Sequence, residues 1–303
     1  MGNLSINGQD SMQPDQAVTA LPVTGWTGPF EPTAVQAAVS ALEAGRVVTL
    51  PALAFDAASA ELAVLSPDLL SGKRKNISLD PTTGKIGGAA DVPPPLAGLM
   101  RRFAAQADSL ARGLLAPYGT ALRAGRTSFR PAEIAGRAYS PRKDDRRLHI
   151  DAFPTRPLRG DRILRLFANI APDGRARDWR VGEPFADLAA RYLPALPAPA
   201  AARARLYALL GLTKGVRSGY DQMMLALHDT MKQDEAYQAS APVLPWSFPA
   251  GTTWMVFTDQ VPHAAMAGHF ALEQTFYLPV GAMVSPETAP LRVLERLTGR
   301  VLA

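Results

Sequence analysis

Residues 146–154 of the chain read Arg-Arg-Leu-His-Ile-Asp-Ala-Phe-Pro, with the triplet His149-Ile150-Asp151 at their centre. In an extended strand, residues i and i+2 point to the same face, so His149 and Asp151 present an imidazole and a carboxylate side by side. A distant histidine would complete a metal site, and His263 is the candidate. Two His and one carboxylate, with open positions opposite them, are the ligand set of non-haem Fe(II) oxygenases. The triplet therefore predicts an iron-dependent oxygenase.

The residues around the triplet favour strands. From Arg126 to Ile170 the hydrophobic pattern has a period of two, and turn residues separate the triplet from the run Arg162 to Ile170. Counting along that run places Arg165, Phe167 and Asn169 on the face opposite an uninterrupted apolar face. We expect Arg165 and Asn169 to point into a cavity, because a buried Arg without an anionic partner is costly. An Arg that points into the cavity implies that an anionic group lies in the cavity beside it.

The distal ligand has a similar setting. Thr253 to Asp259 is strand-like, and Gln260-Val261-Pro262 turns the chain just before His263. We expect this turn at the rim of a barrel, where a metal ligand is well placed. The remaining histidines have simpler interpretations: His269 follows Gly268 in a predicted surface loop, and His228 lies in a predicted helix beside Asp229, as a hydrogen-bonded structural residue.

The order of the predicted elements indicates one mixed α+β domain. Residues 1–20 are polar and are predicted to be disordered. Strands before and after a helical insertion at about 183–237 complete each other, so residues 21–303 are expected to form a single domain. A double-stranded β-helix, or jelly roll, brings an early and a late strand together at its mouth, with N-terminal, inserted and C-terminal helices packed outside. The expected helices are 34–44, 96–115, 183–192, 201–210, 220–237 and 291–302; the other expected strands are 46–50, 247–248, 252–259 and 270–279, and 71–95 is expected to be a loop.

Composition narrows the class of protein. The chain has 303 residues, of which 47% are hydrophobic, which suffices for a sizeable core. It contains no Cys, which excludes disulfides, zinc-thiolate sites and thiol nucleophiles. No apolar run approaches the ~20 residues of a membrane span, and the start lacks the layout of a signal peptide. We therefore expect a cytoplasmic protein.

The basic residues cluster beside the triplet. The formal net charge is +5. This cluster favours an anionic substrate or surface, but a solvated basic face balanced by Asp144 and Asp145 explains it equally well. Nucleic acid is not an expected partner, because the basic residues are not interleaved with aromatic ones and no reading motif is present. The cluster consists of Arg137, Arg142, Lys143, Arg146 and Arg147.

Longer strings carry a resemblance to a known family. The chain resembles the bacterial hydroxylases of Kdo, 3-deoxy-D-manno-oct-2-ulosonic acid, from about residue 46 to 280. These strings are far more specific than the triplet. They are residues 126–131, residues 140–154, Trp179-Arg180-Val181-Gly182-Glu183-Pro184-Phe185, residues 257–265 and Leu272-Glu273-Gln274-Thr275-Phe276.

The resemblance implies a reaction and its cofactors. The family is a group of Fe(II)- and 2-oxoglutarate-dependent dioxygenases that hydroxylate Kdo at carbon 3, using dioxygen. By this resemblance, His149, Asp151 and His263 hold Fe(II). The substrate would be the acidic sugar on lipid A, and the basic cluster, with Lys73 to Lys75, would then give peripheral contact with the inner membrane.

The resemblance also raises the question of which cation holds the far carboxylate of 2-oxoglutarate. Many relatives in the wider superfamily place an Arg ten to fourteen residues after the distal His, but Glu273 to Tyr277 contains no Arg or Lys. We expect Arg165 to take this role from its facing position, with Arg126 and Arg130 next, because the Arg fork fits a carboxylate. Gln274 would add a neutral hydrogen bond.

Two alternatives stay open from the sequence. A dioxygenase of the same chemistry could act on a small soluble acid instead. A non-catalytic jelly-roll module that binds sugar could also retain a triplet that only resembles a metal site.

Overall fold

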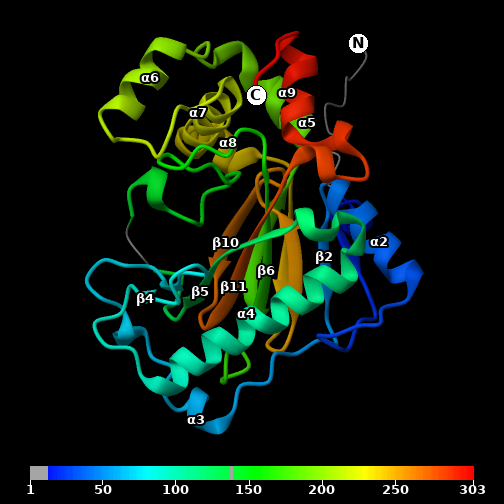
Figure 1. The fold of residues 1–303 in the computed structure, drawn as a ribbon, viewed down its shortest axis with the longest axis vertical. Helices are drawn as coiled ribbons and strands as arrows, with labels where there is room; N and C mark the ends of the chain where they lie inside the picture. The colour runs from blue at the N-terminus through cyan, green and yellow to red at the C-terminus, as the bar shows by residue number, and fades with distance from the viewer. Residues whose placement is uncertain (1–12, 137–138) are drawn as a thin grey trace, which may run out of the picture.

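The structure is a computed structural model that describes residues 13–136 and 139–303, and it confirms a mixed α+β architecture (Figure 1). The larger sheet has the strand order β1-β2-β9-β6-β11-β5-β3-β4, and the smaller has the order β10-β7-β8. All pairs are antiparallel except β1 with β2. The large-sheet strands are β1 (Val18–Ala20), β2 (Val47–Leu50), β9 (Thr253–Phe257), β6 (Arg162–Asn169), β11 (Ala271–Leu278), β5 (Arg123–Arg130), β3 (Ile77–Leu79) and β4 (Ile86–Gly87); those of the small sheet are β10 (His263–Ala267), β7 (Arg177–Gly182) and β8 (Val243–Phe248).

The helices lie outside the sheets. The helices before β5 are α1 (Pro14–Ala17), α2 (Pro32–Glu43), α3 (Ser59–Leu62) and α4 (Pro94–Leu114). The inserted helices α5 (Phe185–Tyr192), α6 (Ala201–Leu209), α7 (Gly219–Gln233) and α8 (Glu235–Ser240) occupy the expected insertion, and α9 (Pro290–Thr298) follows the last strand. None of the helices in the described part of the chain is both long and apolar enough to cross a membrane.

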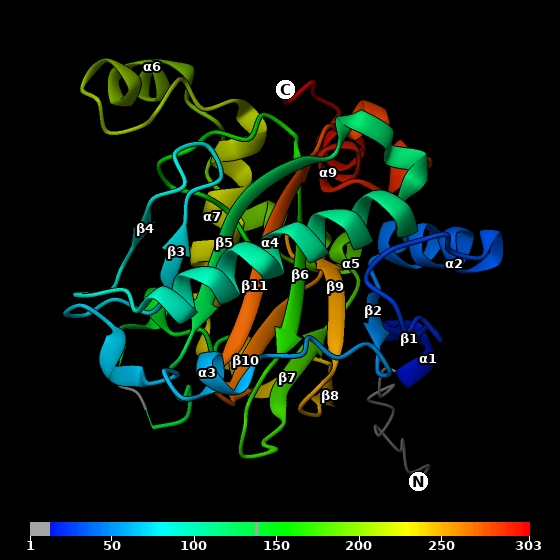
Figure 2. The same ribbon diagram turned by 60° about the horizontal axis from the view of Figure 1, so that its bottom comes forward.

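Helix α4 covers the outer face of the large sheet, where it crosses β5, β6 and β11 (Figures 1 and 2). Its buried residues recur at spacings of three and four, which is the stripe expected of a helix packed on one side. Pro94 and Pro95 start the helix, where a missing N–H costs nothing. The buried stripe consists of Leu96, Leu99, Met100, Phe103, Ala107, Leu110, Ala111 and Leu114.

A second, smaller apolar cluster lies between the two sheets. Trp254 stacks on Phe248 with ring centroids 4.1 Å apart, and Trp179 meets Phe167 edge to face at 5.3 Å. These aromatic contacts hold the small sheet against the inner face of the large one. The candidate site described below lies beside this cluster.

Three expectations need correction. Residues 1–12 lie outside the described part of the chain, but 14–20 are not disordered, because they form α1 and β1, and β1 pairs with β2. The expected loop 71–95 contains β3 and β4, which extend the large sheet beyond β5. The triplet itself lies in an extended segment with one isolated β-bridge rather than in a regular strand.

Candidate metal centre

Main-chain hydrogen bonds bring the two ends of the predicted ligand set together. The His149 N–H donates to the His263 carbonyl at 3.0 Å, and the His263 N–H donates to the His149 carbonyl at 2.9 Å. The Asp151 N–H donates to the Thr258 carbonyl at 2.7 Å. These bonds keep the triplet extended although it is not part of a continuous β-ladder. Ile150 therefore points into the core, fully buried, while His149 and Asp151 point the other way.

One ligand atom each from His149, Asp151 and His263 lie within 4.8 Å of one another. The imidazole centroids of the two histidines are 4.6 Å apart. Metal bonds to His nitrogen and carboxylate oxygen are about 2.0–2.2 Å long, so a single ion can reach all three side chains. The convergence expected from the sequence is therefore present.

Each imidazole is oriented by a carbonyl two residues before it. Nδ1 of His149 lies 2.8 Å from the Arg147 carbonyl, and Nδ1 of His263 lies 2.9 Å from the Val261 carbonyl. A carbonyl can only accept, so each Nδ1 carries the proton and Nε2 keeps its lone pair. This is the outer-shell arrangement that fixes metal-binding histidines in proteins. In residues 13–136 and 139–303, neither Nε2 makes a hydrogen bond.

The electrostatics match the protonation that a metal requires. Burial, together with the nearby His263, holds the pKa of His149 well below its usual range, and burial also lowers the pKa of His263. Burial alone would raise the pKa of Asp151, but the positive charge of Arg165, together with the two neighbouring histidines and a hydrogen bond from Thr258, lowers that pKa strongly. The site thus offers two neutral imidazoles and one carboxylate, the forms in which these groups bind a cation.

A cavity of about 100 Å³ opens beside the three side chains, between the two sheets. Trp179 forms one wall and stacks on the His263 ring with centroids 5.2 Å apart. Four Arg and Asp side chains outside the triplet make the cavity strongly polar. The full lining is Arg130, Asp145, His149, Asp151, Arg165, Phe167, Arg177, Trp179, His263 and Ala265.

Arg165 lines the cavity, as the facing argument expected, but it already has two acidic partners. Its Nε donates to Asp151 Oδ2 at 2.6 Å, and its Nη1 donates to Glu273. Arg130 approaches the same Glu273 from the other side, with Nε donating at 2.6 Å. Both Arg side chains are therefore largely compensated in charge by carboxylates within the protein.

Arg177 is the cation that the sequence argument missed. It is only 3% exposed, it lines the cavity, and its Nε and Nη1 atoms have no hydrogen-bond partner among residues 13–136 and 139–303. Burial and the neighbouring Arg130 lower the pKa of Arg177 to about 9. Burying a cation whose N–H donors are unpaired costs free energy of folding unless an anion binds to those donors. The i, i+2 spacing of Arg177 and Trp179 indicates that both side chains share one face of a strand. Which way that face points depends on the pairing of β7 with β10, the strand that begins at His263.

The other predicted site residues lie elsewhere. Arg126 is exposed and lines a separate groove, 3.8 Å from Asp80. Gln274 is buried among β-strand partners, where it bonds Thr127 Oγ1 at 2.5 Å. Asn169 shares the strand face of Arg165, but its amide donates to the Arg175 and Phe248 carbonyls and braces the strand end. Gln274 and Asn169 therefore do not line the cavity, contrary to expectation.

The two remaining histidines stay outside the ligand set. His228 bonds Asp229 at 3.1 Å, as the structural interpretation expected, and its ring meets that of His149 edge to face. His269 pairs with Asp173 at 3.1 Å and is more buried than a surface loop would suggest.

The basic cluster near the triplet is mostly neutralised. Arg137 lies outside the described residues. Of the others, Arg146 pairs with Asp144 at 2.8 Å, and Arg147 lies 2.9 Å from Glu235. Lys75 pairs with Asp145 at 2.9 Å. The structure thus favours a balanced face over a bare basic surface here.

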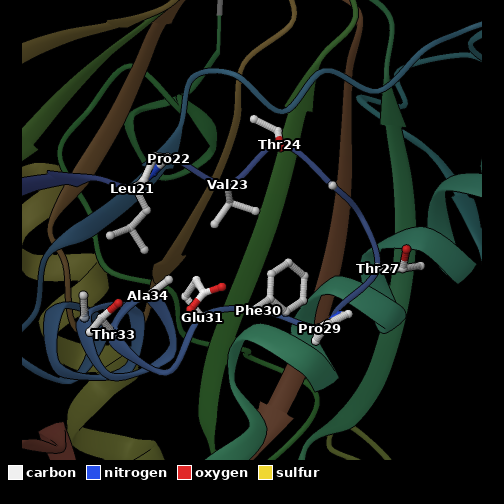
Figure 3. A pocket seen from close by; sticks show the side chains of 12 residues that line it. Leu21, Pro22, Val23, Thr24, Thr27, Pro29, Phe30, Glu31, Thr33 and Ala34 are labelled. Atoms are coloured by element: carbon white, nitrogen blue, oxygen red, sulfur yellow. The ribbon is translucent and has the colours of Figure 1, made fainter.

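Two of the other cavities in the described part of the chain are relevant here. A groove of about 470 Å³ adjoins the metal cavity and shares Arg130 and Arg165 with it; its outer wall carries Arg126, Arg156 and Lys214. A cavity of about 550 Å³ lies near the N-terminal segment between Leu21 and Ala37, and it contains no predicted site residue (Figure 3).

Comparison with known proteins gives a consistent result. The family model described as 3-deoxy-D-manno-oct-2-ulosonic acid (Kdo) hydroxylase matches residues 26–301. The apo structure of the Kdo hydroxylase KdoO, a non-haem Fe(II)- and α-ketoglutarate-dependent dioxygenase, is 45% identical, with a TM-score of 0.91 over 95% of this chain and 97% of that one. A structure of KdoO with α-ketoglutarate and Fe(III) is 44% identical, covers 95% and 98%, and has a TM-score of 0.91. A comparison with curated protein sequences found no match.

Proposed function

The chain belongs to the Kdo hydroxylase family of Fe(II)- and 2-oxoglutarate-dependent dioxygenases, and on that premise we propose that it hydroxylates carbon 3 of a Kdo sugar on a lipid A precursor. The observation that carries the proposal is the convergence of His149, Asp151 and His263 beside a cationic cavity. Because this family consists of dioxygenases, the alternative of a non-catalytic sugar-binding module is excluded.

The donor set fits a ferrous ion. Two Nε2 lone pairs and one carboxylate converge, and the chain offers no thiolate that would favour a softer metal. Held by His149, Asp151 and His263, Fe(II) would supply the oxidising power to insert one oxygen atom of dioxygen into a substrate C–H bond. The other oxygen atom would go to 2-oxoglutarate, which would leave as succinate and carbon dioxide.

Arg177 is our assignment for the far carboxylate of 2-oxoglutarate. Arg177 lines the cavity that the ligand triplet borders, its Nε and Nη1 donors are unpaired in the described part of the chain, and Arg130 lines the same cavity. A carboxylate would complete the bidentate pairing that an Arg fork prefers. Arg165, expected for this role from the sequence, instead orients the carboxylate of Asp151 through a 2.6 Å bond.

Aromatic side chains form part of the cavity wall. Trp179 lies flat against His263, and Phe167 packs on Trp179 from β6. An oxygenase must keep water from its reactive centre, since premature quenching wastes the co-substrate. These aromatic side chains, 3% exposed each, provide that barrier.

The adjoining groove is the proposed place of the sugar acid. Arg126, Arg156 and Lys214 line it beside the hydroxyl groups of Ser78, Ser128 and Thr275, which suits a ligand that combines carboxylate and hydroxyl groups. The groove meets the metal cavity at Arg130 and Arg165, so that a sugar held there would lie next to the iron ligands.

The proposal includes the finer features of the fold. We assign the two facing sheets to a double-stranded β-helix, with residues 21–303 as one domain that also includes β1 of the large sheet. The support is that β10 of the small sheet and the triplet segment meet at one end of the cavity, where jelly-roll enzymes place their metal. The lipid A carrier, a cytoplasmic location and peripheral contact with the inner membrane belong to the same proposal.

The direct test uses a water-soluble Kdo glycoside with Fe(II), 2-oxoglutarate and air. We expect one oxygen atom to be added to the sugar for each succinate formed, and NMR to place it at carbon 3. Asp151→Ala should abolish both products. Succinate formation without an oxygenated sugar, or turnover only with small soluble acids, would overturn the substrate assignment. Under anaerobic conditions, Fe(II) with 2-oxoglutarate should give a weak visible band that Asp151→Ala lacks.

A further inference from the structure

The exposed apolar residues of the protein are concentrated in one short segment. Of eight large hydrophobic side chains that are exposed in residues 13–136 and 139–303, five lie between Leu206 and Val216. Leu209 is the most exposed of the five, at 84%. A contiguous apolar patch on a surface marks an interaction site far more often than scattered residues do. The five are Leu206, Leu209, Leu210, Leu212 and Val216.

The same segment is purely cationic. From residue 188 to residue 220 the chain contains no Asp or Glu, and residues 203–217 contain Arg203, Arg205, Lys214 and Arg217. Among the described ion pairs, none involves Arg203, Arg205 or Lys214. This distinguishes the segment from the basic cluster around Arg146, where carboxylates neutralise the charge.

Helix α6, which carries most of the patch, is scarcely attached to the core. Only Ala204 of its residues is buried. In both views α6 stands apart from the sheets at the edge of the molecule (Figures 1 and 2). Leu206, Leu209 and Leu210 are spaced by three and four residues, so they lie on one face. The apolar face of α6 is therefore left uncovered by the described part of the chain.

The segment is also tied to the proposed substrate groove. The Lys214 N–H donates to the Thr155 carbonyl at 2.8 Å, and both residues line the groove. Arg217 donates to the Pro154 carbonyl from the same loop. A partner of α6 would therefore lie next to the proposed substrate groove.

We propose that α6 and the loop up to Arg217, here called the docking segment, insert their leucines into the surface of an anionic lipid bilayer. Leucines on one face with Arg and Lys around them are the composition of interfacial helices, which bind by apolar burial and by attraction to anionic headgroups. The inference rests on the proposed function in one respect: a substrate carried on lipid gives docking its purpose, because the groove then opens at the membrane surface.

Vesicle flotation of the full chain tests the docking segment directly. The probes are vesicles of phosphatidylcholine alone and with phosphatidylglycerol, at low and at high salt. We expect binding to the anionic vesicles at low salt and much less in high salt. Leu209→Ser/Leu210→Ser should weaken this binding by at least about tenfold, and Arg203→Gln/Arg205→Gln by about tenfold or more on anionic vesicles only.

The matched control removes exposed apolar residues elsewhere. Val284 and Leu297 are 60% and 47% exposed, and Val284→Ser/Leu297→Ser should float with the vesicles like the wild type. An equal loss in this control and in the leucine variant would overturn the assignment to α6. So would self-association in sedimentation that Leu209→Ser/Leu210→Ser abolishes, because the patch would then join copies of the chain.

Two substrates separate failure of docking from failure of the proposed function. On a water-soluble Kdo glycoside, Leu209→Ser/Leu210→Ser should turn over at the wild-type rate, which also shows that it folds. On a Kdo glycolipid embedded in anionic vesicles, it should lose about tenfold or more in kcat/KM. Equal rates of variant and wild type on the vesicles would overturn docking. A wild type that floats with vesicles but does not hydroxylate the soluble glycoside would overturn the proposed function and leave docking standing.

Discussion

His149 and His263 exchange a reciprocal pair of main-chain hydrogen bonds, at 3.0 and 2.9 Å, although they are far apart in the sequence. Each imidazole is turned by a carbonyl two residues before it, so the backbone that joins the two segments also aims their side chains. The ligand geometry is therefore set before any ion binds, which lowers the cost of ordering the site when it does.

Removal of the carboxylate should release the metal. Asp151→Ala takes away the only acidic member of the triplet, and we expect affinity for cobalt(II) to fall by about a hundredfold or more, beyond the effect of losing an outer-shell partner. Titration followed by the visible spectrum of cobalt measures this without turnover. Asp173→Ala, at an exposed ion pair with His269, is the control and should bind as the wild type does. Undiminished binding by Asp151→Ala would contradict the site.

Arg177→Met should impair the keto acid and spare the metal. Loss of a charge-assisted hydrogen-bond pair is worth about 1.5–3 kcal/mol, so we expect the KM for 2-oxoglutarate to rise roughly 10- to 100-fold. Cobalt(II) affinity should change little, because Arg177 contacts none of the three ligands in the described hydrogen bonds. Arg175→Met, at an exposed side chain two positions earlier, is the matched control. An unchanged KM would return the role to Arg165 or Arg130.

Gly182→Ala should disturb the turn that delivers His263. A Cβ at Gly182 would lie 2.8 Å from the Pro262 Cβ, and the Gly182 N–H already donates to the Pro262 carbonyl at 2.7 Å. Overpacking of this kind costs about 1–3 kcal/mol, which urea denaturation would detect, and cobalt binding should weaken with it. Gly98→Ala in α4, where a Cβ meets nothing, should instead match or exceed wild-type stability. Equal stability of the two variants would contradict the prediction, because the turn at Pro262 would then accommodate the added Cβ without cost.

The metal-free protein should lose stability as pH falls below about 6.5. His149 and His263 have folded-state pKa values below the ordinary 6.5, so the unfolded chain takes up protons first and gains on the folded state. Their contribution is complete above pH 6.5 and declines below it, until the folded pKa values are reached. Urea denaturation at several pH values measures the slope, which should be shallower in His149→Gln/His263→Gln. A flat wild-type curve would contradict the burial argument.

Part of the site could be predicted from local rules. The i, i+2 geometry that pairs His149 with Asp151 holds in any extended segment, so it survived although the segment is not a regular strand. The turn before His263 was recognisable from Gln260-Val261-Pro262, and the alternation of β6 put Arg165 and Phe167 on the cavity wall. The helices were recognisable because an apolar stripe with Pro at its start is a local pattern.

The sequence by itself determined the chemistry on offer: which side chains can bind a metal, which cannot because Cys is absent, and which neighbours share a strand face. Only the tertiary structure decided which cations are satisfied. Arg165 and Arg146 pair with carboxylates. Within the described residues, Arg177 is buried with two unpaired donors, and the leucines of α6 are exposed. The reason is that charge compensation and burial depend on residues brought close by folding, whereas strand and helix periodicity depends on residues a few positions apart.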